Sequence, residues 1–125
     1  MRKELTETQI QNLRNWIKAL RSGDYKQGEG CLYNNKDDSF CCLGVACDLF
    51  QVPYNKSARQ YVFEVYGDVY FENKLIPGIN FEEMFGLTVI FGDELASMND
   101  VNQYSFADIA TEIENEVFSQ YGITL

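Results

Sequence analysis

An almost unbroken apolar run, Phe40–Phe50, constrains this chain more than any other stretch. Within it only Gly44 and Asp48 lack an apolar side chain. Such a segment must lie inside the folded protein, because transfer of apolar surface out of water is the main force that drives folding. Its length and its Ala and Leu content favour a buried helix over residues 43–50 rather than a strand. The other elements are therefore expected to pack around this central helix.

Amphipathic helices are predicted near both ends of the chain. Thr6 and Gln9 have the spacing of a capping box, and apolar residues then recur every three or four positions, which predicts a helix over residues 7–21 closed by Gly23. Ser105 is the predicted cap of the last helix. The inward-facing stripe of that helix is expected to contain Phe106, Ile109, Ile113 and Val117.

Short elements are predicted between these helices, and together they define the fold class. The sequence predicts a hairpin from residues 31–33 and 39–42, a second hairpin over residues 61–71, a short helix ending at Gly86, a strand at Thr88–Phe91 and one or two helical turns over residues 93–99. We therefore expect one small α+β domain over residues 1–125, in which N- and C-terminal helices pack with short antiparallel hairpins and a buried central helix.

Charge is distributed unevenly along the 125 residues. Residues 1–60 hold nine Lys or Arg against seven Asp or Glu, a balance of +2, whereas residues 61–125 hold one against twelve, a balance of −11. The acidic half would repel a phosphate backbone, so direct nucleic-acid binding is not expected. No apolar run reaches the ~20 residues of a membrane span, and the N-terminus lacks a secretory pattern. A cytoplasmic location is expected.

All four cysteines lie in or near the central segment, at positions 31, 41, 42 and 47. Four thiolates could bind zinc, but structural zinc sites usually have paired C-x2-4-C spacings, and the adjacent Cys41 and Cys42 would point to opposite faces of a strand. Free cysteine is also one of the most frequently buried residues. Packed core thiols are therefore favoured over a zinc site, and no metal or other cofactor is predicted.

Catalytic patterns are missing from the sequence. Histidine is absent, and no phosphate-binding, dinucleotide-binding or zinc-protease motif occurs. Glu112 and Glu116 lie one helical turn apart and repel one another, so a solvated acidic face is favoured over a catalytic carboxylate pair. We do not expect an enzyme.

The C-terminal part of the first helix and the glycine-bearing connector after it form the main candidate for ligand binding, with Arg14, Arg21, Tyr25, Lys26, Gln27 and the backbones of Gly28 and Gly30. Arginine forks bind phosphate bidentately and an aromatic ring can stack on a base, so the group predicts an anion site. The alternative is that the arginines pair with nearby acids while Tyr25 and Gln27 pack the connector. Asn99 and Asp100 are a further candidate pair, and an ordinary turn is the alternative for them.

Three motifs resemble a family of small uncharacterised bacteriophage and prophage proteins. They are Trp16-Ile17-x-Ala19-Leu20-Arg21-Ser22-Gly23, then Phe40-Cys41-Cys42-Leu43-Gly44-Val45-x-Cys47-Asp48-Leu49, and finally Asn99-Asp100 followed by Ser105-Phe106-Ala107-Asp108-Ile109-Ala110. The resemblance covers both ends of the chain and hardly any of residues 51–93. It implies a virus-encoded accessory protein in a bacterial cytoplasm and supplies no mechanism.

Two functions fit these expectations. In the first, a non-enzymatic anti-defence protein sequesters a small phosphate-bearing ligand of the host, such as a signalling nucleotide, within an oligomer or a deep pocket. In the second, the acidic half mimics nucleic acid and blocks a basic groove on a host defence or regulatory protein. The first is preferred because it also uses the many aromatic residues of segment 61–71.

Overall fold

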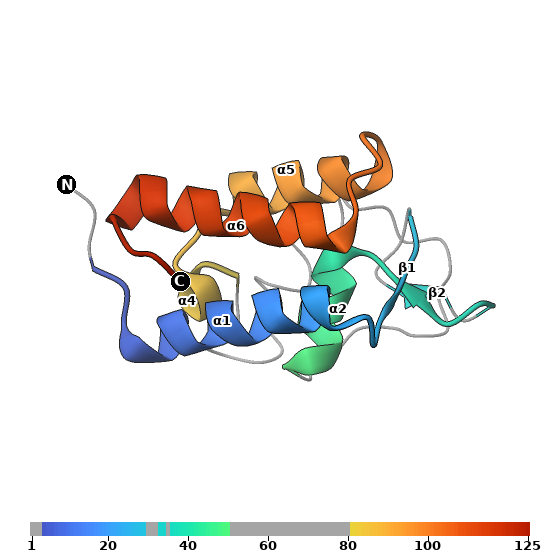
Figure 1. The fold of residues 1–125 in the computed structure, drawn as a ribbon, viewed down its shortest axis with the longest axis horizontal. Helices are drawn as coiled ribbons and strands as arrows, with labels where there is room; N and C mark the ends of the chain where they lie inside the picture. The colour runs from blue at the N-terminus through green and yellow to red at the C-terminus, as the bar shows by residue number, and fades with distance from the viewer. Residues whose placement is uncertain (1–3, 30–32, 35, 51–80) are drawn as a thin grey trace.

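A computed structural model describes residues 4–29, 33–34, 36–50 and 81–125 of the chain (Figure 1). Within these residues the elements are α1 (Glu7–Ser22), β1 (Lys26–Gln27), β2 (Tyr33–Asn34), β3 (Ser39–Phe40), α2 (Cys42–Leu49), α4 (Phe81–Phe85), α5 (Val89–Asp100) and α6 (Phe106–Tyr121). The α+β class and the helices at the two ends are confirmed. The second predicted hairpin lies outside the described residues.

The two long helices begin and end where their caps predict. Thr6 and Gln9 form a complete capping box at the start of α1, and Ser105 and Asp108 form another at the start of α6. Gly23 ends α1 in the left-handed region, with φ of 81°, where a side chain would be strained. The predicted stripe of α6 is buried along its whole length. The local patterns therefore determine both helices.

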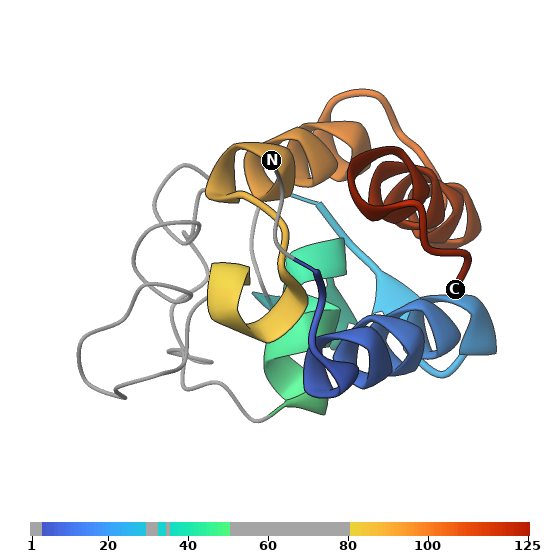
Figure 2. The same cartoon turned by 90° about the vertical axis from the view of Figure 1, so that its left-hand side faces the viewer.

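The helices surround a core centred on α2. Figure 1 shows α1 and α6 antiparallel along the long axis, with the small sheet beyond the C-terminal end of α1. Figure 2 shows α5, α6 and α1 as a curved row, with α4 and α2 on its inner side. The first six residues of α2 are buried, which confirms the buried central helix. The indole Nε1 of Trp16 donates to the carbonyl of Cys42 over 3.1 Å and joins α1 to the start of α2.

The sheet contains one strand that the sequence did not indicate. β2 and β3 pair antiparallel, which confirms the predicted first hairpin, and β1 then pairs parallel with the other edge of β3. Gly28 follows β1, and a Cβ at this position would lie only 2.2 Å from Oγ of Ser39. The connector after α1 is thus held against β3 at a distance that excludes a side chain.

The predicted strand at Thr88–Phe91 is wrong, because these residues begin α5. The Thr88 side chain accepts a hydrogen bond from the Phe91 amide and caps the helix. Val89 and Ile90 have high β-propensity, but packing outweighs it: Phe91 and Leu95, one helical turn apart, are both buried in the core. In the part of the chain that the structure describes, no helix has the length and apolar character needed to cross a membrane.

Candidate functional site

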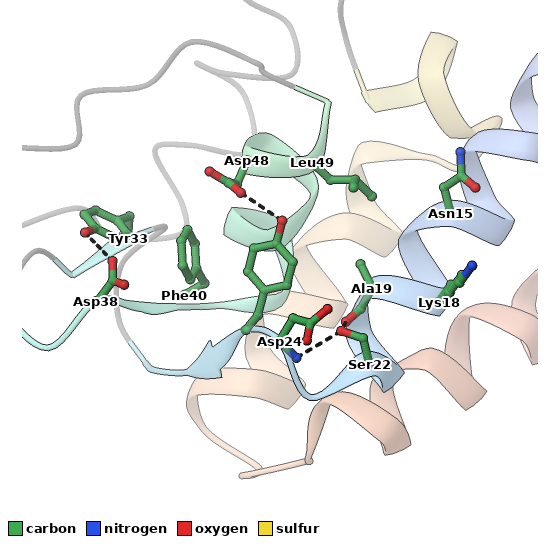
Figure 3. A pocket seen from close by; sticks show the side chains of 11 residues that line it. Asn15, Lys18, Ala19, Ser22, Asp24, Tyr33, Asp38, Phe40, Asp48 and Leu49 are labelled. Carbon is green, nitrogen blue, oxygen red and sulfur yellow. Dashed lines mark hydrogen bonds between the residues drawn. The ribbon is translucent and has the colours of Figure 1, made fainter.

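A cavity of about 680 Å³ opens where α1, α2 and the sheet meet (Figure 3). We call it the aromatic hollow. Its walls are formed by Asn15, Lys18, Ala19, Ser22, Asp24, Tyr25, Tyr33, Asp38, Phe40, Asp48 and Leu49. Its volume is within the range of small-molecule sites.

Three rings form one continuous aromatic surface in this hollow. Phe40 lies between Tyr25 and Tyr33, with ring centroids 5.1 Å and 4.9 Å away respectively. Tyr25 and Phe40 meet edge to face, the arrangement that ring quadrupoles favour. Phe40 is buried at the end of β3, so the surface has a fixed base. The arrangement suits stacking of a planar ligand.

The charges of the aromatic hollow are mostly negative, with three aspartates against one lysine. The Tyr25 hydroxyl donates to Oδ2 of Asp48 over 2.8 Å, and the Tyr33 hydroxyl donates to Oδ1 of Asp38. Figure 3 shows Asp38 and Asp48 on the sheet side and Lys18 on the α1 side. Both tyrosine protons are thus directed at carboxylates.

The hydroxyl of Tyr25 is the most perturbed titrating group of the hollow. Burial, its hydrogen bond to Asp48 and the negative charges of Asp48 and Asp24 raise the pKa of Tyr25 to about 12. Because its pKa is higher in the folded state than in the unfolded chain, neutral Tyr25 stabilises the fold below pH ~10, and this contribution is lost as the pH rises toward 12.

Replacement of Tyr25 by phenylalanine tests this linkage. We expect the wild type to be more stable than Tyr25→Phe by about 1 kcal/mol at pH 8, because one hydrogen bond is lost in the variant. The difference should shrink between pH 10 and pH 12. Urea unfolding of both proteins across this pH range measures it, and a difference that stays constant would contradict the assignment.

A second cavity, of about 470 Å³, adjoins the first along α1. We call it the basic hollow. It is lined by Arg14, Ile17, Lys18, Arg21, Ser22, Glu114 and Leu125. Lys18 and Ser22 line both hollows. Its lining surface is mostly apolar, and three cationic side chains and one acidic side chain contribute to it.

Arg21 is held by α6. Its guanidinium donates to both carboxylate oxygens of Glu114 over 2.8 Å and to Oγ1 of Thr111 over 3.1 Å. These hydrogen bonds from Arg21 lower the pKa of the Glu114 carboxyl below its usual range. Arg21 therefore follows the alternative interpretation, in which the arginines pair with nearby acids. Among the described residues, neither Arg14 nor Lys18 forms an ion pair.

Gln27 and Asn99, two of the predicted ligand residues, bind each other inside the protein. Nε2 of Gln27 donates to Oδ1 of Asn99 and to the carbonyl of Tyr104, both over 2.8 Å, while its Oε1 accepts from the Phe106 amide over 3.1 Å. Nδ2 of Asn99 donates to the carbonyl of Gly28 and to Asp100, again over 2.8 Å. This node ties β1 to the turn between α5 and α6. Neither hollow is lined by it.

Six of the seven predicted residues occupy three places. Tyr25 lines the aromatic hollow, Arg14 and Arg21 line the basic hollow, and Gln27, Asn99 and Asp100 form the node. Lys26 lies on β1 and approaches Asp37 at 3.8 Å. The amide of Gly28 donates to the carbonyl of Phe40 over 2.7 Å, so it is used by the sheet rather than by an anion. Gly30 lies outside the described residues.

Several lining residues were not predicted, among them Lys18, Tyr33, Asp38 and Asp48. The sequence could have indicated Asp48 as a site residue, because a carboxylate inside the apolar run Phe40–Phe50 needs a polar partner or solvent. The structure supplies Tyr25 as one partner. The aromatic ring of Tyr33 faces this site only because β2 pairs with β3, which spacing along the chain does not reveal.

The three described cysteines are fully buried, as expected of core thiols. Burial raises the pKa of the Cys42 and Cys47 thiols well above the ordinary value. Among the residues that the structure describes, no cluster of three or more His, Cys, Asp or Glu could hold a metal ion. Cys31 lies outside them.

Residues 7–83 match a family described as a domain of unknown function, DUF8296. The chain belongs to this family. No curated protein matches the chain, and no solved structure does. Every residue that lines the aromatic hollow falls inside the segment matched to DUF8296, whereas Glu114 and Leu125 of the basic hollow lie beyond it. The aromatic hollow is therefore built wholly from the DUF8296 part of the chain.

Proposed function

We propose that this DUF8296 protein is a non-enzymatic accessory protein that binds and sequesters a small phosphate-bearing ligand, such as a signalling nucleotide of the host. The observation that carries the proposal is the contact between two different cavities, since Lys18 and Ser22 line both. One cavity offers aromatic surface and the other offers positive charge. A nucleotide combines a planar base with an anionic phosphate in one molecule.

The base would lie in the aromatic hollow. The half-buried rings of Tyr25 and Tyr33 offer surface there, and stacking of a base on an aromatic side chain contributes about 1–3 kcal/mol. A phosphate would not be favoured at that end, because Asp24, Asp38 and Asp48 would repel it.

The phosphate would lie in the basic hollow. Arg14 and Lys18 are one helical turn apart on α1, so their side chains share a face. Arg21 is paired with Glu114 and adds no net charge, so Arg14 and Lys18 supply the positive charge. The order of charges along α1 therefore orients the ligand, with its phosphate over α1 and its base toward the sheet.

A sequestering role fits the chemistry of these cavities. The hydroxyls of Tyr25 and Tyr33, whose pKa values are raised, donate to carboxylates. The three described cysteines are buried and line neither cavity, so the described residues place no activated nucleophile at either one. The resemblance to bacteriophage proteins implies an accessory protein in a bacterial cytoplasm, and the proposal adds an anti-defence role and a homo-oligomeric state.

Titration calorimetry with the four common nucleoside monophosphates tests the proposal. We expect at least one to bind, and we expect Arg14→Gln and Lys18→Gln each to weaken it about tenfold, since each removes a charge-assisted contact with phosphate. Tyr33→Leu should weaken binding similarly, whereas Tyr33→Phe should not, because the ring does the stacking. Lys36→Gln is the matched control, as this exposed lysine lines neither hollow.

Two results would contradict the proposal. Lack of binding by all four nucleotides, together with no nucleotide-sized mass in native mass spectra of protein purified from bacteria, would exclude sequestration of this ligand class. Recovery of a chemically changed nucleotide after incubation would show that the protein is an enzyme.

The acidic-mimic function has one observation in its favour. The helices α4, α5 and α6 contain no Lys or Arg, and α6 exposes Asp108 with Glu112 and Glu116 half-exposed beside it. Glu114, however, is paired with Arg21 of the same chain. A salt-sensitive complex with a basic host protein, formed by nucleotide-free protein, would favour this second function.

A further inference from the structure

The charged side chains that line the basic hollow indicate how much phosphate it would accept. Arg14 and Lys18 form no ion pair among the described residues, whereas the charge of Arg21 is balanced by Glu114. Three cations and one carboxylate leave this lining with a net charge of +2. A phosphate monoester carries about −1.5 to −2 charges at pH 7, so the charge of the hollow matches one such group.

Arg14 and Lys18 lie close enough together to share a single phosphate. They are four residues apart on α1, which separates their Cα atoms by about 6 Å along the helix axis. Both side chains are exposed and project from the same face of the helix, so both can reach oxygens of one phosphate group. Lys18 also lines the aromatic hollow, and this phosphate would therefore be the one next to the base.

The uncharged part of the basic hollow does not suit a second phosphate. Ile17 and Leu125 make its lining mostly apolar, and apolar surface cannot replace the water that surrounds an anion. Ser22 supplies the one uncharged polar side chain of this lining, and its hydroxyl donates to the carbonyl of Ala19 over 2.7 Å. A further phosphate would thus lose hydration without gaining an equivalent partner.

The ion pair between Arg21 and Glu114 adds repulsion to this loss of hydration. The guanidinium donates to both carboxylate oxygens of Glu114 and to Oγ1 of Thr111, so three of its hydrogen bonds are already made within the protein. The Glu114 carboxylate would lie near any anion that extends past the first phosphate, and like charges repel.

We propose that the site is selective for a nucleoside monophosphate over the corresponding diphosphate and triphosphate, with the single phosphate held by Arg14 and Lys18. This inference rests on the proposed function, because it assumes that a nucleotide base occupies the aromatic hollow. The pair of Arg21 and Glu114 then determines specificity, since it leaves the first phosphate in place and disfavours the next.

Titration calorimetry on the full chain tests this selectivity. It compares the monophosphates, diphosphates and triphosphates of adenosine, guanosine, cytidine and uridine, together with the four nucleosides, at constant ionic strength. Divalent cations are omitted because they would neutralise the additional phosphates. For a base that binds, we expect the monophosphate to bind about tenfold more tightly than the triphosphate, because each added phosphate costs about threefold through screened repulsion. The diphosphate should lie between them.

The possible outcomes separate this inference from the proposed function. A triphosphate that binds as tightly as its monophosphate, or more tightly, would overturn the selectivity and leave the proposed function standing. A nucleoside that binds as tightly as its monophosphate would overturn both, because the phosphate would then not be recognised. Lack of binding by all of these compounds would overturn the proposed function and this inference with it.

Glu114→Gln provides a second measurement with its own control. Glutamine keeps the shape of the side chain but removes the charge that balances Arg21, so the net charge of the lining rises to +3. We expect the preference for the monophosphate over the triphosphate to fall from about tenfold to about twofold or less. Glu94→Gln, an equal loss of charge on α5 at a residue that lines neither hollow, should leave the preference unchanged. A full preference in Glu114→Gln would overturn the role of the ion pair.

Discussion

Replacement of Trp16 by alanine is expected to lower the free energy of unfolding by about 3–5 kcal/mol, the usual cost of truncating a buried aromatic side chain. Trp16 is fully buried and contacts Phe85, with ring centroids 4.6 Å apart, and Phe81, with centroids 6.0 Å apart and planes at 89°. It therefore joins α1 to α4 as well as to α2. A loss of this size is a large part of the 5–15 kcal/mol that stabilises most domains.

A second variant separates the packing of Trp16 from its hydrogen bond. Trp16→Phe keeps a ring but removes the Nε1–H that donates to Cys42, so we expect a smaller loss of about 1–3 kcal/mol. Gln11→Ala is the control on the exposed face of α1 and should change stability by less than ~0.5 kcal/mol.

Urea unfolding followed by far-UV circular dichroism measures these losses in all three variants. The wild type can also be followed by fluorescence, since Trp16 is the single tryptophan. A loss below ~1 kcal/mol for Trp16→Ala would mean that α1 does not pack on α4 and α2 as described.

The two long helices, α1 and α6, could be predicted because the sequence patterns that specify them are local. The capping residues Thr6 and Ser105 lie next to the apolar stripes that they precede, so one window of sequence contains the whole pattern. β1 was not predictable, because its two residues gain their structure only by pairing with β3, twelve or more positions away. The error at Thr88–Phe91 has a related cause: β-branched residues indicate a strand locally, while burial against the core selects the helix.

The candidate site was predicted in part. Arg14 and Arg21 line the same hollow because their helical spacing places them on one face of α1. Tyr25 and Gln27 were grouped with them as neighbours in sequence, but their side chains enter different surroundings after Gly23 ends α1. Alternation along an extended segment would place residues two positions apart on one face, but Tyr25 precedes β1, which begins only at Lys26, so this rule does not relate the two side chains. Contacts between segments therefore limit how much of the candidate site can be predicted from the sequence alone.

Replacement of Asn99 by leucine is expected to lower the free energy of unfolding by roughly 2–5 kcal/mol, because each buried polar group that loses its partner costs about 1–3 kcal/mol. Asn99 is fully buried in the described structure. Leucine has a similar volume, so little cavity is created, but the carbonyl of Gly28 would lose its 2.8 Å donor and Gln27 would lose one of its acceptors. Asn102→Leu, in the exposed turn after α5, is the control and should be nearly neutral.

Gln27→Leu makes the test specific to the node. It removes the same Gln27–Asn99 hydrogen bond together with the contacts to Tyr104 and Phe106. Residues in one hydrogen-bond network are not independent, so the double variant should lose less stability than the sum of the two single losses, by about 1 kcal/mol or more. Urea unfolding of the four proteins completes the cycle. Exact additivity would mean that the two side chains act separately.

The same variants distinguish the two roles considered for Asn99. If Asn99 were a ligand contact exposed in a cavity, Asn99→Leu would keep its stability and lose affinity for any nucleotide that the wild type binds. If it closes the node, as the structure indicates, the variant loses stability but its folded fraction should bind that nucleotide with nearly unchanged affinity, because neither hollow is lined by Asn99. Calorimetric titration at a temperature where the variant is still folded separates these outcomes. The node would then hold β1 beside the turn before α6, and so position the sheet from which Tyr33 and Phe40 enter the aromatic hollow.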